Sequence, residues 1–251
     1  MPSPTHQRAD EYLVSHGLAE SRTQAKDLIE QNLVLLGGSP IKKASKRIQE
    51  GSVLELVASP RFVSRGGEKL ESLLKICLLE LSGKIALDVG ASTGGFTDCL
   101  LQHDVAEVTC IDVGHGQLHP KLQEDPRVTN LEKINAREID SIKLPYLHYP
   151  IIVMDLSFIS LKKVLEPIWR RLEASGHLIV LIKPQFEAPL ELIKQGSGII
   201  RDATVRAKIL QEMVAFCERQ LPGAYVVHTL ECPIAGKDGN REYLLCLKKN
   251  R

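Results

Sequence analysis

Charged residues stand at the ends of several apolar runs, where parallel strands would bring them together. Asp88 lies at the end of the run 85–89, Asp155 ends a second run, and Lys183 directly follows a third. The carboxyl ends of parallel strands meet at one edge of a doubly wound sheet, so these side chains are expected to share one site. A carboxylate and an amine held together can direct or accept a proton, which is acid–base chemistry.

The turn that follows Asp88 is rich in small residues and fits neither standard phosphate-binding loop. A nucleoside triphosphate loop needs Gly-Lys-Ser/Thr, and a dinucleotide loop needs Gly-x-Gly-x-x-Gly. The run Gly90-Ala91-Ser92-Thr93-Gly94-Gly95 supplies neither pattern. The turn therefore predicts a nucleotide-like ligand without a pyrophosphate, while the simpler alternative is a plain strand–helix turn.

S-adenosylmethionine is the ligand that suits this turn best, since it needs a backbone-lined cleft and an acid for its ribose hydroxyls. Asp112 ends the next apolar run, about 20 residues beyond the turn, where a ribose-binding acid is expected. Asp88 could hold the amino group, directly or through water. Asn135 and Ala136 would border the adenine, with a solvated loop as the alternative. The predicted cofactor contacts are Asp88, Gly90, Ser92, Thr93, Gly94, Gly95, Phe96, Asp112, Asn135, Ala136 and Asp155.

Residues 68–251 alternate strand and helix patterns, which predicts a doubly wound, Rossmann-like α/β sheet. The last two expected strands are close enough in sequence to pair antiparallel. Strands are expected at 85–89, 107–112, 128–131, 151–155, 177–183, 224–231 and 243–248, and helices at 68–80, 95–102, 161–173 and 203–219.

Residues 1–58 predict a separate, small α+β unit, joined to the rest by a linker at 59–67. Helical patterns cover 8–16 and 21–30, the second opened by a capping box from Ser21 to Gln24. Strands are expected at 33–38 and 53–57. The patterns Arg8-Ala9-Asp10-x-Tyr12-Leu13 and Gly17-Leu18-Ala19-x-Ser21-Arg22 resemble the S4-like RNA-binding module, apart from Ala9, where that module usually has Leu.

This resemblance implies that basic residues of the small unit contact RNA phosphates. The alternative is that Arg22 only closes the capping turn and that the lysines only keep the chain in solution. The predicted RNA contacts are Arg8, Arg22, Lys26, Lys42, Lys43 and Lys46.

Methylation of a sugar hydroxyl would give the charged residues a common task, because a hydroxyl attacks poorly until its proton is drawn away. Desolvation and the neighbouring cation Lys69 could lower the pKa of Lys183, while Asp155 and Glu242 orient the two amines. Taken singly, Asp155 could be an ordinary strand-end acid, Lys69 a cation on a helix surface, and Glu242 a salt-bridge partner of Arg241. Phe158 and Phe186 could stack a splayed base, although packing is the commoner fate of such aromatics.

The four charged positions resemble, residue by residue, the Lys-Asp-Lys-Glu tetrad of the FtsJ-like ribose methyltransferases. They stand in Gly-Gly-Glu-Lys69-Leu, Met-Asp155-Leu-Ser, Ile-Lys183-Pro-Gln-Phe and Asn-Arg-Glu242-Tyr. With the S4-like module, residues 7–249 resemble the TlyA family, often labelled haemolysin A. The resemblance implies methyl transfer from S-adenosylmethionine to the 2′-hydroxyl of cytidine in ribosomal RNA. It leaves open which nucleotide and subunit are modified, and whether Lys183 removes the proton or positions the hydroxyl.

The composition is that of a soluble globular chain. Of 251 residues, 43% are hydrophobic and 25% are charged, and no apolar run approaches the roughly 20 residues of a membrane span. The first residues contain no hydrophobic signal core, so a cytoplasmic location is expected. Six cysteines without a Cys-x-x-Cys pair argue against a metal cage or a disulfide framework.

These features favour ribosomal RNA or ribosomal subunits as the partner, with no metal and no membrane. Oligomeric state stays open. Two alternatives of other classes are a secreted, membrane-damaging haemolysin and a catalytically inactive RNA-binding assembly factor. The absence of an export signal or amphipathic segment disfavours the first, and the complete tetrad disfavours the second. A methyltransferase for small molecules or proteins is disfavoured by the RNA-binding module.

Overall fold

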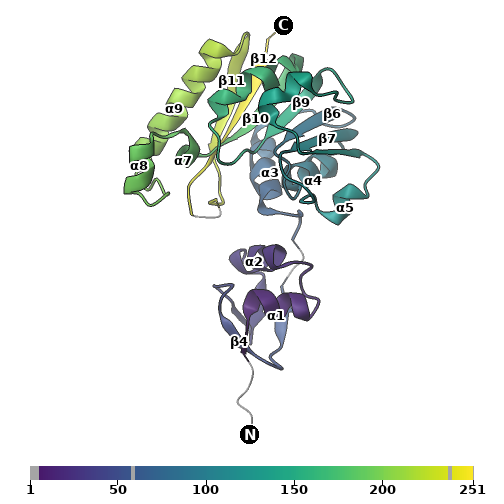
Figure 1. The fold of residues 1–251 in the computed structure, drawn as a ribbon, viewed down its shortest axis with the longest axis vertical. Helices are drawn as coiled ribbons and strands as arrows, with labels where there is room; N and C mark the ends of the chain where they lie inside the picture. Colours follow the sequence, from purple (N-terminus) through teal and green to yellow (C-terminus); the bar gives the residue numbers. More distant parts are fainter. Residues whose placement is uncertain (1–5, 58–59, 237–238, 251) are drawn as a thin grey trace. The chain divides into compact units, whose positions relative to one another are not determined.

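The computed structural model describes residues 6–57, 60–236 and 239–250 (Figure 1). Contacts between residues divide the chain into two compact units, Met1–Ser64 and Arg65–Arg251. Helix α3 (Arg65–Cys77) opens the second unit and begins three residues before position 68, so it takes in the end of the expected linker. It also ends earlier than residue 80. Phe62, in the expected linker, is buried.

The small unit combines two helices with two short sheets. Helices α1 (Ala9–Ser15) and α2 (Arg22–Glu30) pack together over a core that includes Leu13, Leu28 and Ile48. The expected strands at 33–38 and 53–57 form as β2 (Val34–Leu36) and β5 (Leu54–Leu56), which pair antiparallel beside β3 (Ser39–Pro40). Sequence reasoning missed β3 and the antiparallel pair of β1 (His6–Arg8) with β4 (Arg47–Gln49).

The predicted cap of α2 is confirmed. The Ser21 hydroxyl oxygen accepts a hydrogen bond from the Gln24 backbone N–H at 3.2 Å. The side chain of Gln24 accepts in turn from the backbone N–H of Glu20, one residue before the position a standard capping box would use. Two backbone N–H groups at this helix start are therefore satisfied within the small unit itself.

The large unit is a seven-stranded sheet with helices on both faces, as predicted. Among the described residues its strand order is β11-β12-β10-β9-β6-β7-β8, and β12 runs opposite to the other six strands. Figure 1 shows β11, with α9 beside it, on one side of the sheet, and β6 and β7 toward the other side. The strands are β6 (Ile85–Val89), β7 (Glu107–Asp112), β8 (Val128–Glu132), β9 (Tyr149–Met154), β10 (Leu172–Ile182), β11 (Ala224–Glu231) and β12 (Tyr243–Lys249).

Alternate strand residues face different helices. Leu87 and Val89 of β6 pack into a core shared with α6 (Leu165–Arg170) and α9 (Ala203–Gln220). Asp88, between them, therefore points to the opposite face, where α3 packs against α4 (Gly95–Gln102). This alternation decides which acids of the strand ends can reach a ligand.

Shorter helices complete the large unit, and two of them correct the expectation of one helix at 161–173. The helix expected at 161–173 is divided into η2 (Leu161–Lys163) and α6, and Leu172 already belongs to β10. The segment after Lys183 forms α7 (Pro184–Glu187) and α8 (Leu190–Gln195). Two further short helices are α5 (Pro120–Gln123) and η1 (Ala136–Ser141).

Candidate active site

The four residues of the predicted tetrad come from three strand ends and one helix. Asp155 follows β9, Lys183 follows β10, and Glu242 precedes β12. Ile182 pairs with Tyr243 in antiparallel register, so Lys183 and Glu242 leave the sheet side by side. Lys69 lies on α3. The antiparallel direction of β12 is what brings its starting residue to the edge where the parallel strands end.

Lys69 and Glu242 form the more deeply buried of two ion pairs. The Lys69 Nζ donates to Glu242 Oε2 at 2.6 Å, and the two side chains are 9% and 4% exposed. Gly236 lies against the same carboxylate, and a β-carbon at position 236 would collide with it. The carboxylate is thus enclosed by its lysine and by bare backbone.

Lys183 and Asp155 form the second pair, which is more accessible. The Lys183 Nζ lies 2.5 Å from Asp155 Oδ1 and donates to the Ser157 hydroxyl oxygen at 2.8 Å. The Asp155 side chain is 27% exposed, against 4% for Glu242. The amine is therefore held from two sides by the segment that follows β9.

Cys232 lies beside the Lys69–Glu242 pair. Its backbone N–H donates to the Glu242 carbonyl oxygen at 2.8 Å. Burial raises the pKa of its thiol to about 12. The residue that follows β11 is therefore a buried, neutral thiol next to this ion pair.

A cavity of about 470 Å³ opens beside this site, and Asp155 and Ser157 belong to its wall. Of the predicted cofactor contacts, it is lined by Gly90, Ser92, Asp112, Asn135, Ala136 and Asp155. Sequence reasoning missed several apolar lining residues, including Ile111, Val113, Ile134 and Leu156, and the polar side chain of Gln117. Val113 and Ile134 could have been predicted from the sequence, because they stand directly next to the expected cofactor contacts Asp112 and Asn135.

Asp112 shapes the turn that borders the cavity. Its Oδ2 accepts from the Ser92 backbone N–H at 2.8 Å, and its Oδ1 accepts from the Gly114 backbone N–H at 2.6 Å. Gly90 has φ +84°, and a β-carbon there would collide with the Asp155 carbonyl oxygen. Only glycine lets the turn approach the end of β9 so closely.

Five of the predicted cofactor contacts do not line this cavity. Asp88 is fully buried, and its Oδ2 accepts from the Thr97 hydroxyl at 2.7 Å. Burial raises the pKa of Asp88 to about 7. Its Oδ1 has no hydrogen-bond partner among the described residues. The other four are Thr93, Gly94, Gly95 and Phe96.

Packing explains two of these positions. Gly94 caps α4 with φ 92°, and a β-carbon there would collide with Leu122 of α5. Phe96 is buried on α4. The structure thus gives Gly94 the plainer role of a tight strand–helix turn, whereas Gly90 approaches the cavity itself.

Two aromatic rings lie on the segments that follow Asp155 and Lys183. The expected burial is wrong for Phe158, whose side chain is 91% exposed and whose φ is +65°. The ring of Phe186 lies 5.3 Å from that of Phe158, between centroids. Phe158 also belongs to the cavity wall. An exposed aromatic face therefore stands beside the charged site.

The basic residues of the small unit fall into two groups. Arg8 and Arg22 both bind Asp10, which is fully buried. Although burial opposes the change, these two hydrogen-bonding arginines lower the pKa of Asp10. Arg22 also lies 3.1 Å from a Glu11 carboxylate oxygen, so it pairs with acids instead of only closing the capping turn.

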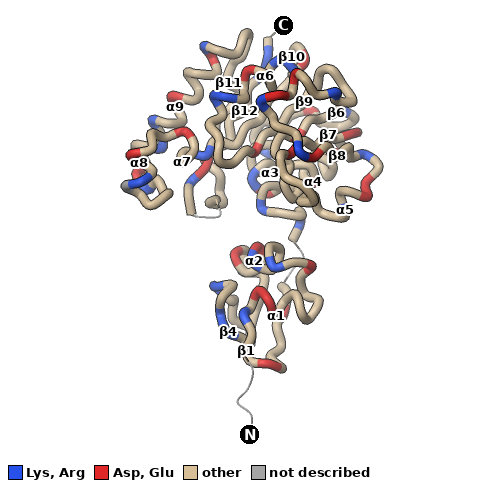
Figure 2. The backbone as a smooth tube through the Cα atoms, viewed as in Figure 1, with Lys and Arg blue, Asp and Glu red and all other residues tan. Residues whose placement is uncertain are grey.

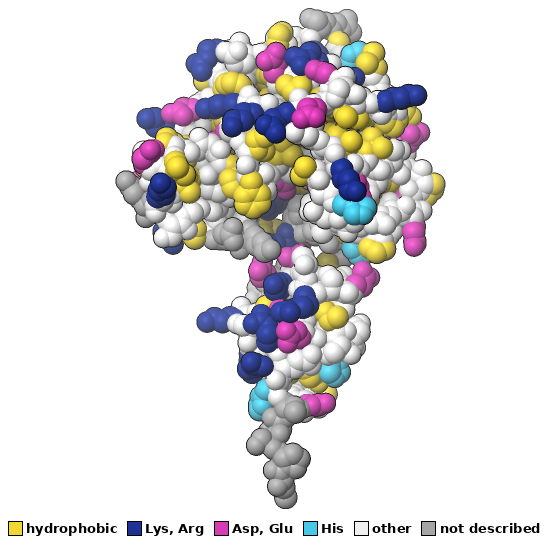
Figure 3. Space-filling view, in the orientation of Figure 1, with side chains coloured by type: hydrophobic (Ala, Val, Ile, Leu, Met, Phe, Trp, Pro, Cys, Tyr) yellow, Lys and Arg dark blue, Asp and Glu magenta, His cyan; other side chains and the backbone are white. Residues whose placement is uncertain are grey.

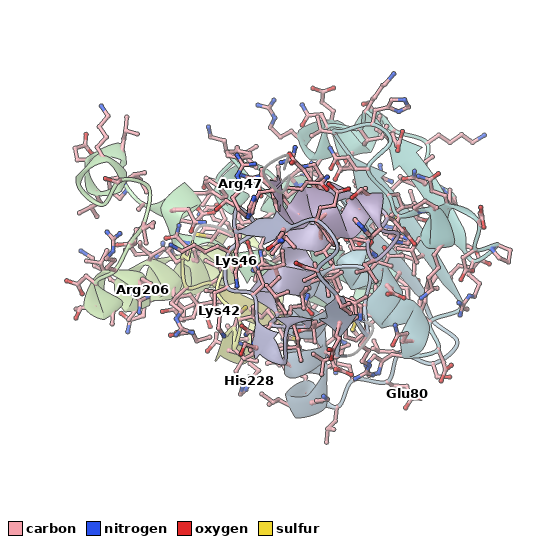
Figure 4. All side chains as sticks on the ribbon, turned by 90° about the horizontal axis from the view of Figure 1, so that it is seen from below. Lys42, Lys46, Arg47, Glu80, Arg206 and His228 are labelled. Carbon is pink, nitrogen blue, oxygen red and sulfur yellow. The ribbon has the colours of Figure 1, made fainter. Side chains whose placement is uncertain are left out.

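The second group is exposed. Figure 2 shows Lys and Arg along β4 and the segment before it, and Figure 3 shows them gathered on the viewed face of the small unit. Lys42, Lys46 and Arg47 lie on the same side of this unit (Figure 4). Lys42 Nζ donates to Asn32 Oδ1 at 2.6 Å, while Lys43 and Lys46 are exposed. Lys26 on α2 is half-buried.

Comparison with known proteins identifies both units. Residues 62–249 match the FtsJ-like methyltransferase model, and residues 7–54 match the S4 domain. Hemolysin A of Brachyspira hyodysenteriae is 40% identical over 94% of this chain and 98% of its own. The 16S/23S rRNA (cytidine-2'-O)-methyltransferase TlyA of Mycobacterium tuberculosis is 37% identical over 96% of this chain and 89% of its own.

Solved structures agree with this likeness. A structure from Streptococcus thermophilus, which carries a hemolysin name, covers 99% of this chain and 90% of its own with 37% identity and a TM-score of 0.75. The N-methyltransferase NodS of Bradyrhizobium japonicum covers 73% of this chain and 96% of its own, with 17% identity and a TM-score of 0.50, which supports the fold alone. Within the described residues, no helix combines the length and apolar character that a membrane span requires.

Proposed function

The chain belongs to the FtsJ-like methyltransferase family, among relatives named hemolysin A and TlyA, and on this premise we propose that it methylates the ribose 2′-hydroxyl of a cytidine in ribosomal RNA. The printed activity of the Mycobacterium tuberculosis relative supports this substrate. The S4 domain supports an RNA partner, either free ribosomal RNA or a ribosomal subunit. Such a partner would meet the enzyme in the cytoplasm.

The cavity fits S-adenosylmethionine as the methyl donor. Its volume of about 470 Å³ lies in the usual range for small-molecule sites. Apolar residues such as Val113 and Ile134 suit an adenine ring, and Asp112 keeps free lone pairs for ribose hydroxyls. The unpartnered, buried Oδ1 of Asp88 suits a water-mediated contact to an amino group. When bound, S-adenosylmethionine supplies an electrophilic methyl group on its sulfonium sulfur.

Lys183 is the residue that we assign to the hydroxyl proton. Asp155 and Ser157 hold its amine from two sides, so one direction is left for a substrate oxygen. For this step the Lys183 ammonium must first release one proton to solvent. The neutral amine then accepts the hydroxyl proton as the 2′-oxygen bonds to the methyl carbon, and Asp155 stabilises the ammonium that forms again. The Lys69–Glu242 pair lies at the same end of the sheet, and we assign it to holding α3 against the start of β12 at this site.

Phe158 and the small unit would present the RNA. An exposed ring beside the site suits stacking of a base that has left its helix, and we assign this role to Phe158. The exposed lysines of the small unit, Lys43 and Lys46, would contact phosphates. Neither the cavity nor the four charged residues supports the membrane-damaging alternative. The complete set of four charged residues disfavours the alternative of a catalytically inactive assembly factor.

The observation that carries this proposal is the meeting of two Lys–carboxylate pairs at one sheet edge, with Asp155 shared between the outer pair and the cavity wall. A generic cofactor cleft needs no such pairs. A ribose methyltransferase does need them, because the hydroxyl must be deprotonated and aligned in the same step.

The test is transfer of labelled methyl from S-adenosylmethionine to ribosomal subunits that lack the modification, followed by mass spectrometry of the nucleosides. Wild-type protein should yield 2′-O-methylcytidine. Lys183→Ala should lose transfer while it keeps affinity for S-adenosylhomocysteine, measured by calorimetry. Lys208→Ala, an exposed lysine on α9, is the matched control. Full turnover by Lys183→Ala would refute its role, and label on no RNA substrate would refute the function.

A further inference from the structure

Beyond the Lys183–Asp155 ion pair, the segments that follow β9 and β10 contact each other through side-chain pairs that come in the same order along both segments. Lys183 Nζ donates to the Ser157 hydroxyl oxygen at 2.8 Å. The rings of Phe186 and Phe158 lie 5.3 Å apart. Glu187 then accepts from Ser160 at 2.6 Å. The Lys183–Ser157 pair belongs to the proposed reaction, whereas the Glu187–Ser160 pair has not been given a role in it.

Glu187 uses both of its carboxylate oxygens on the neighbouring segment. Oε2 accepts from the Ser160 hydroxyl, and Oε1 accepts from the Leu161 backbone N–H at 2.7 Å. Leu161 is the first residue of η2, so the carboxylate satisfies a backbone donor at a helix start. Burial raises the pKa of Glu187, and its two donors oppose that rise. A half-buried acid with both oxygens engaged forms a fixed connection between the two segments.

The segment between these contacts holds an unfavourable conformation. Phe158 has φ +65°, which a bulky side chain rarely adopts, and its ring is exposed instead of packed in a core. Such a residue keeps its position only when contacts on either side hold it there. On one side stand Asp155 and Ser157, tied to Lys183. On the other side stand Ser160 and Leu161, tied to Glu187.

We propose that Glu187 is a positioning residue for methyl transfer, which holds residues 155–161 against the strand end that carries Lys183. The inference rests on the proposed function, since it assigns Glu187 to the alignment of that same site. Without this carboxylate, the segment with Asp155 and Phe158 loses its anchor at η2. The substrate hydroxyl and Lys183 then lose their alignment, although no reacting group has been removed.

Two substitutions separate geometry from charge. Glu187→Ala removes both acceptors. In Glu187→Gln, the side-chain oxygen can still accept from the Leu161 N–H. The side-chain NH₂ can donate to the Ser160 hydroxyl oxygen, because a hydroxyl accepts as well as donates. Glu191→Ala, an exposed acid on α8, is the matched control. Turnover and KM for the ribosomal substrate are measured for each, with affinity for S-adenosylhomocysteine measured separately.

The expected result is a fall in kcat of about 10- to 100-fold for Glu187→Ala, the range that misplacement of reacting groups by about 1 Å produces. Affinity for S-adenosylhomocysteine should fall by a smaller factor than kcat, because Glu187 is not part of the cavity wall, although residues 155–159 of the segment that it holds belong to that wall. Glu187→Gln should recover most of the turnover. A purely structural role would instead lower kcat and cofactor affinity together and would not be rescued by Gln.

Hydrogen exchange gives a second, activity-independent readout. The peptide covering residues 155–163 should exchange faster in Glu187→Ala than in Glu191→Ala, and Ser160→Ala should show a smaller increase. Unchanged exchange, or kcat equal to that of the control, would overturn the proposal. A wild-type protein that transfers no methyl would overturn the proposed function, and faster exchange in Glu187→Ala would still establish the connection between the two segments.

Discussion

Replacing Glu242 by alanine should destabilise the large unit strongly, because it leaves the Lys69 ammonium buried without its carboxylate. The two groups lie 2.6 Å apart, and their side chains are 9% and 4% exposed. Removal of one partner from a buried ion pair costs about 3–5 kcal/mol. In a domain of this size, 1 kcal/mol moves the melting temperature by roughly 2–4 °C, so Tm should fall by about 6–20 °C.

Differential scanning calorimetry and urea unfolding of the full chain measure this effect. Lys183→Ala is the comparison, since it breaks the other pair of the same site. Asp155 is 27% exposed, so water can hydrate the acid that remains, and the expected cost is about 1 kcal/mol or less. The double variant Lys69→Met with Glu242→Leu removes both charges, and it should recover most of the lost stability.

Two results would refute this reasoning. A Glu242→Ala protein whose Tm lies within about 2 °C of wild type would mean that the Lys69 ammonium reaches water or another acid. A double variant no more stable than the single variant Glu242→Leu would mean that the unpaired Lys69 charge is not the cause of the loss. The singles Lys69→Met and Glu242→Leu complete the double-mutant cycle, which measures the coupling of these two contacting residues.

Three further predictions concern pH and salt. Burial raises the pKa of Asp88 to about 7, so the folded protein keeps a proton that the unfolded chain releases near pH 3.8. The free energy of unfolding should therefore fall as pH rises from about 4 to about 7. Urea unfolding at a series of pH values measures this fall, and Asp88→Asn should remove it. His177 should have the opposite effect on the free energy of unfolding. Burial lowers the pKa of His177 to about 4, so its contribution to stability is lost as pH falls below about 6.5, and His177→Gln should remove this loss. The double variant Lys42→Glu with Lys43→Glu should bind ribosomal RNA more weakly. The slope of log K against log[salt] should become shallower by about 0.7–0.9 for each phosphate contact that is lost. Affinity for S-adenosylhomocysteine should stay unchanged. RNA affinity equal to wild type at every salt concentration would place recognition elsewhere.

The centre of the large sheet could be predicted from the sequence residue by residue. Strands β6 and β7 and helix α4 occupy the expected ranges 85–89, 107–112 and 95–102. Buried parallel strands read as continuous apolar runs, and the glycine turn marks where one of them ends. The same runs predict which charged residues reach the common edge, because strand ends in parallel register meet there.

The beginning of β10 could not be predicted in this way. The apolar pattern at 161–173 fits one helix, yet the chain turns at Arg171 and Leu172 already pairs with Tyr149. Ser175 then adopts φ 65°, and the register shifts before His177. Only the neighbouring strand makes residues 172–176 extended. Local propensity carries no information about such a partner.

The partners within the site were equally hidden. The sequence indicates that Asp155, Lys183 and Glu242 share an edge, but not which acid binds which lysine. Pairing depends on the direction of β12 and on the face of α3 that carries Lys69. Glu187 was hidden for the same reason, since its partners Ser160 and Leu161 lie on another strand's loop. The motif Lys183-Pro184-Gln185-Phe186-Glu187 offered a signal, because it places an acid just beyond a strand-end lysine.

The difference in exposure between the two ion pairs assigns their roles. Both join a lysine to a carboxylate, and both lie at one end of the sheet. Asp155 belongs to the cavity wall and is 27% exposed, whereas Glu242 is 4% exposed and enclosed by Lys69 and Gly236. A ligand in the cavity can therefore reach the Asp155 carboxylate of the outer pair, but not the Glu242 carboxylate of the inner pair. It follows that changes at Lys183 and Asp155 act on turnover with little effect on folding, whereas changes at Lys69 and Glu242 act on both.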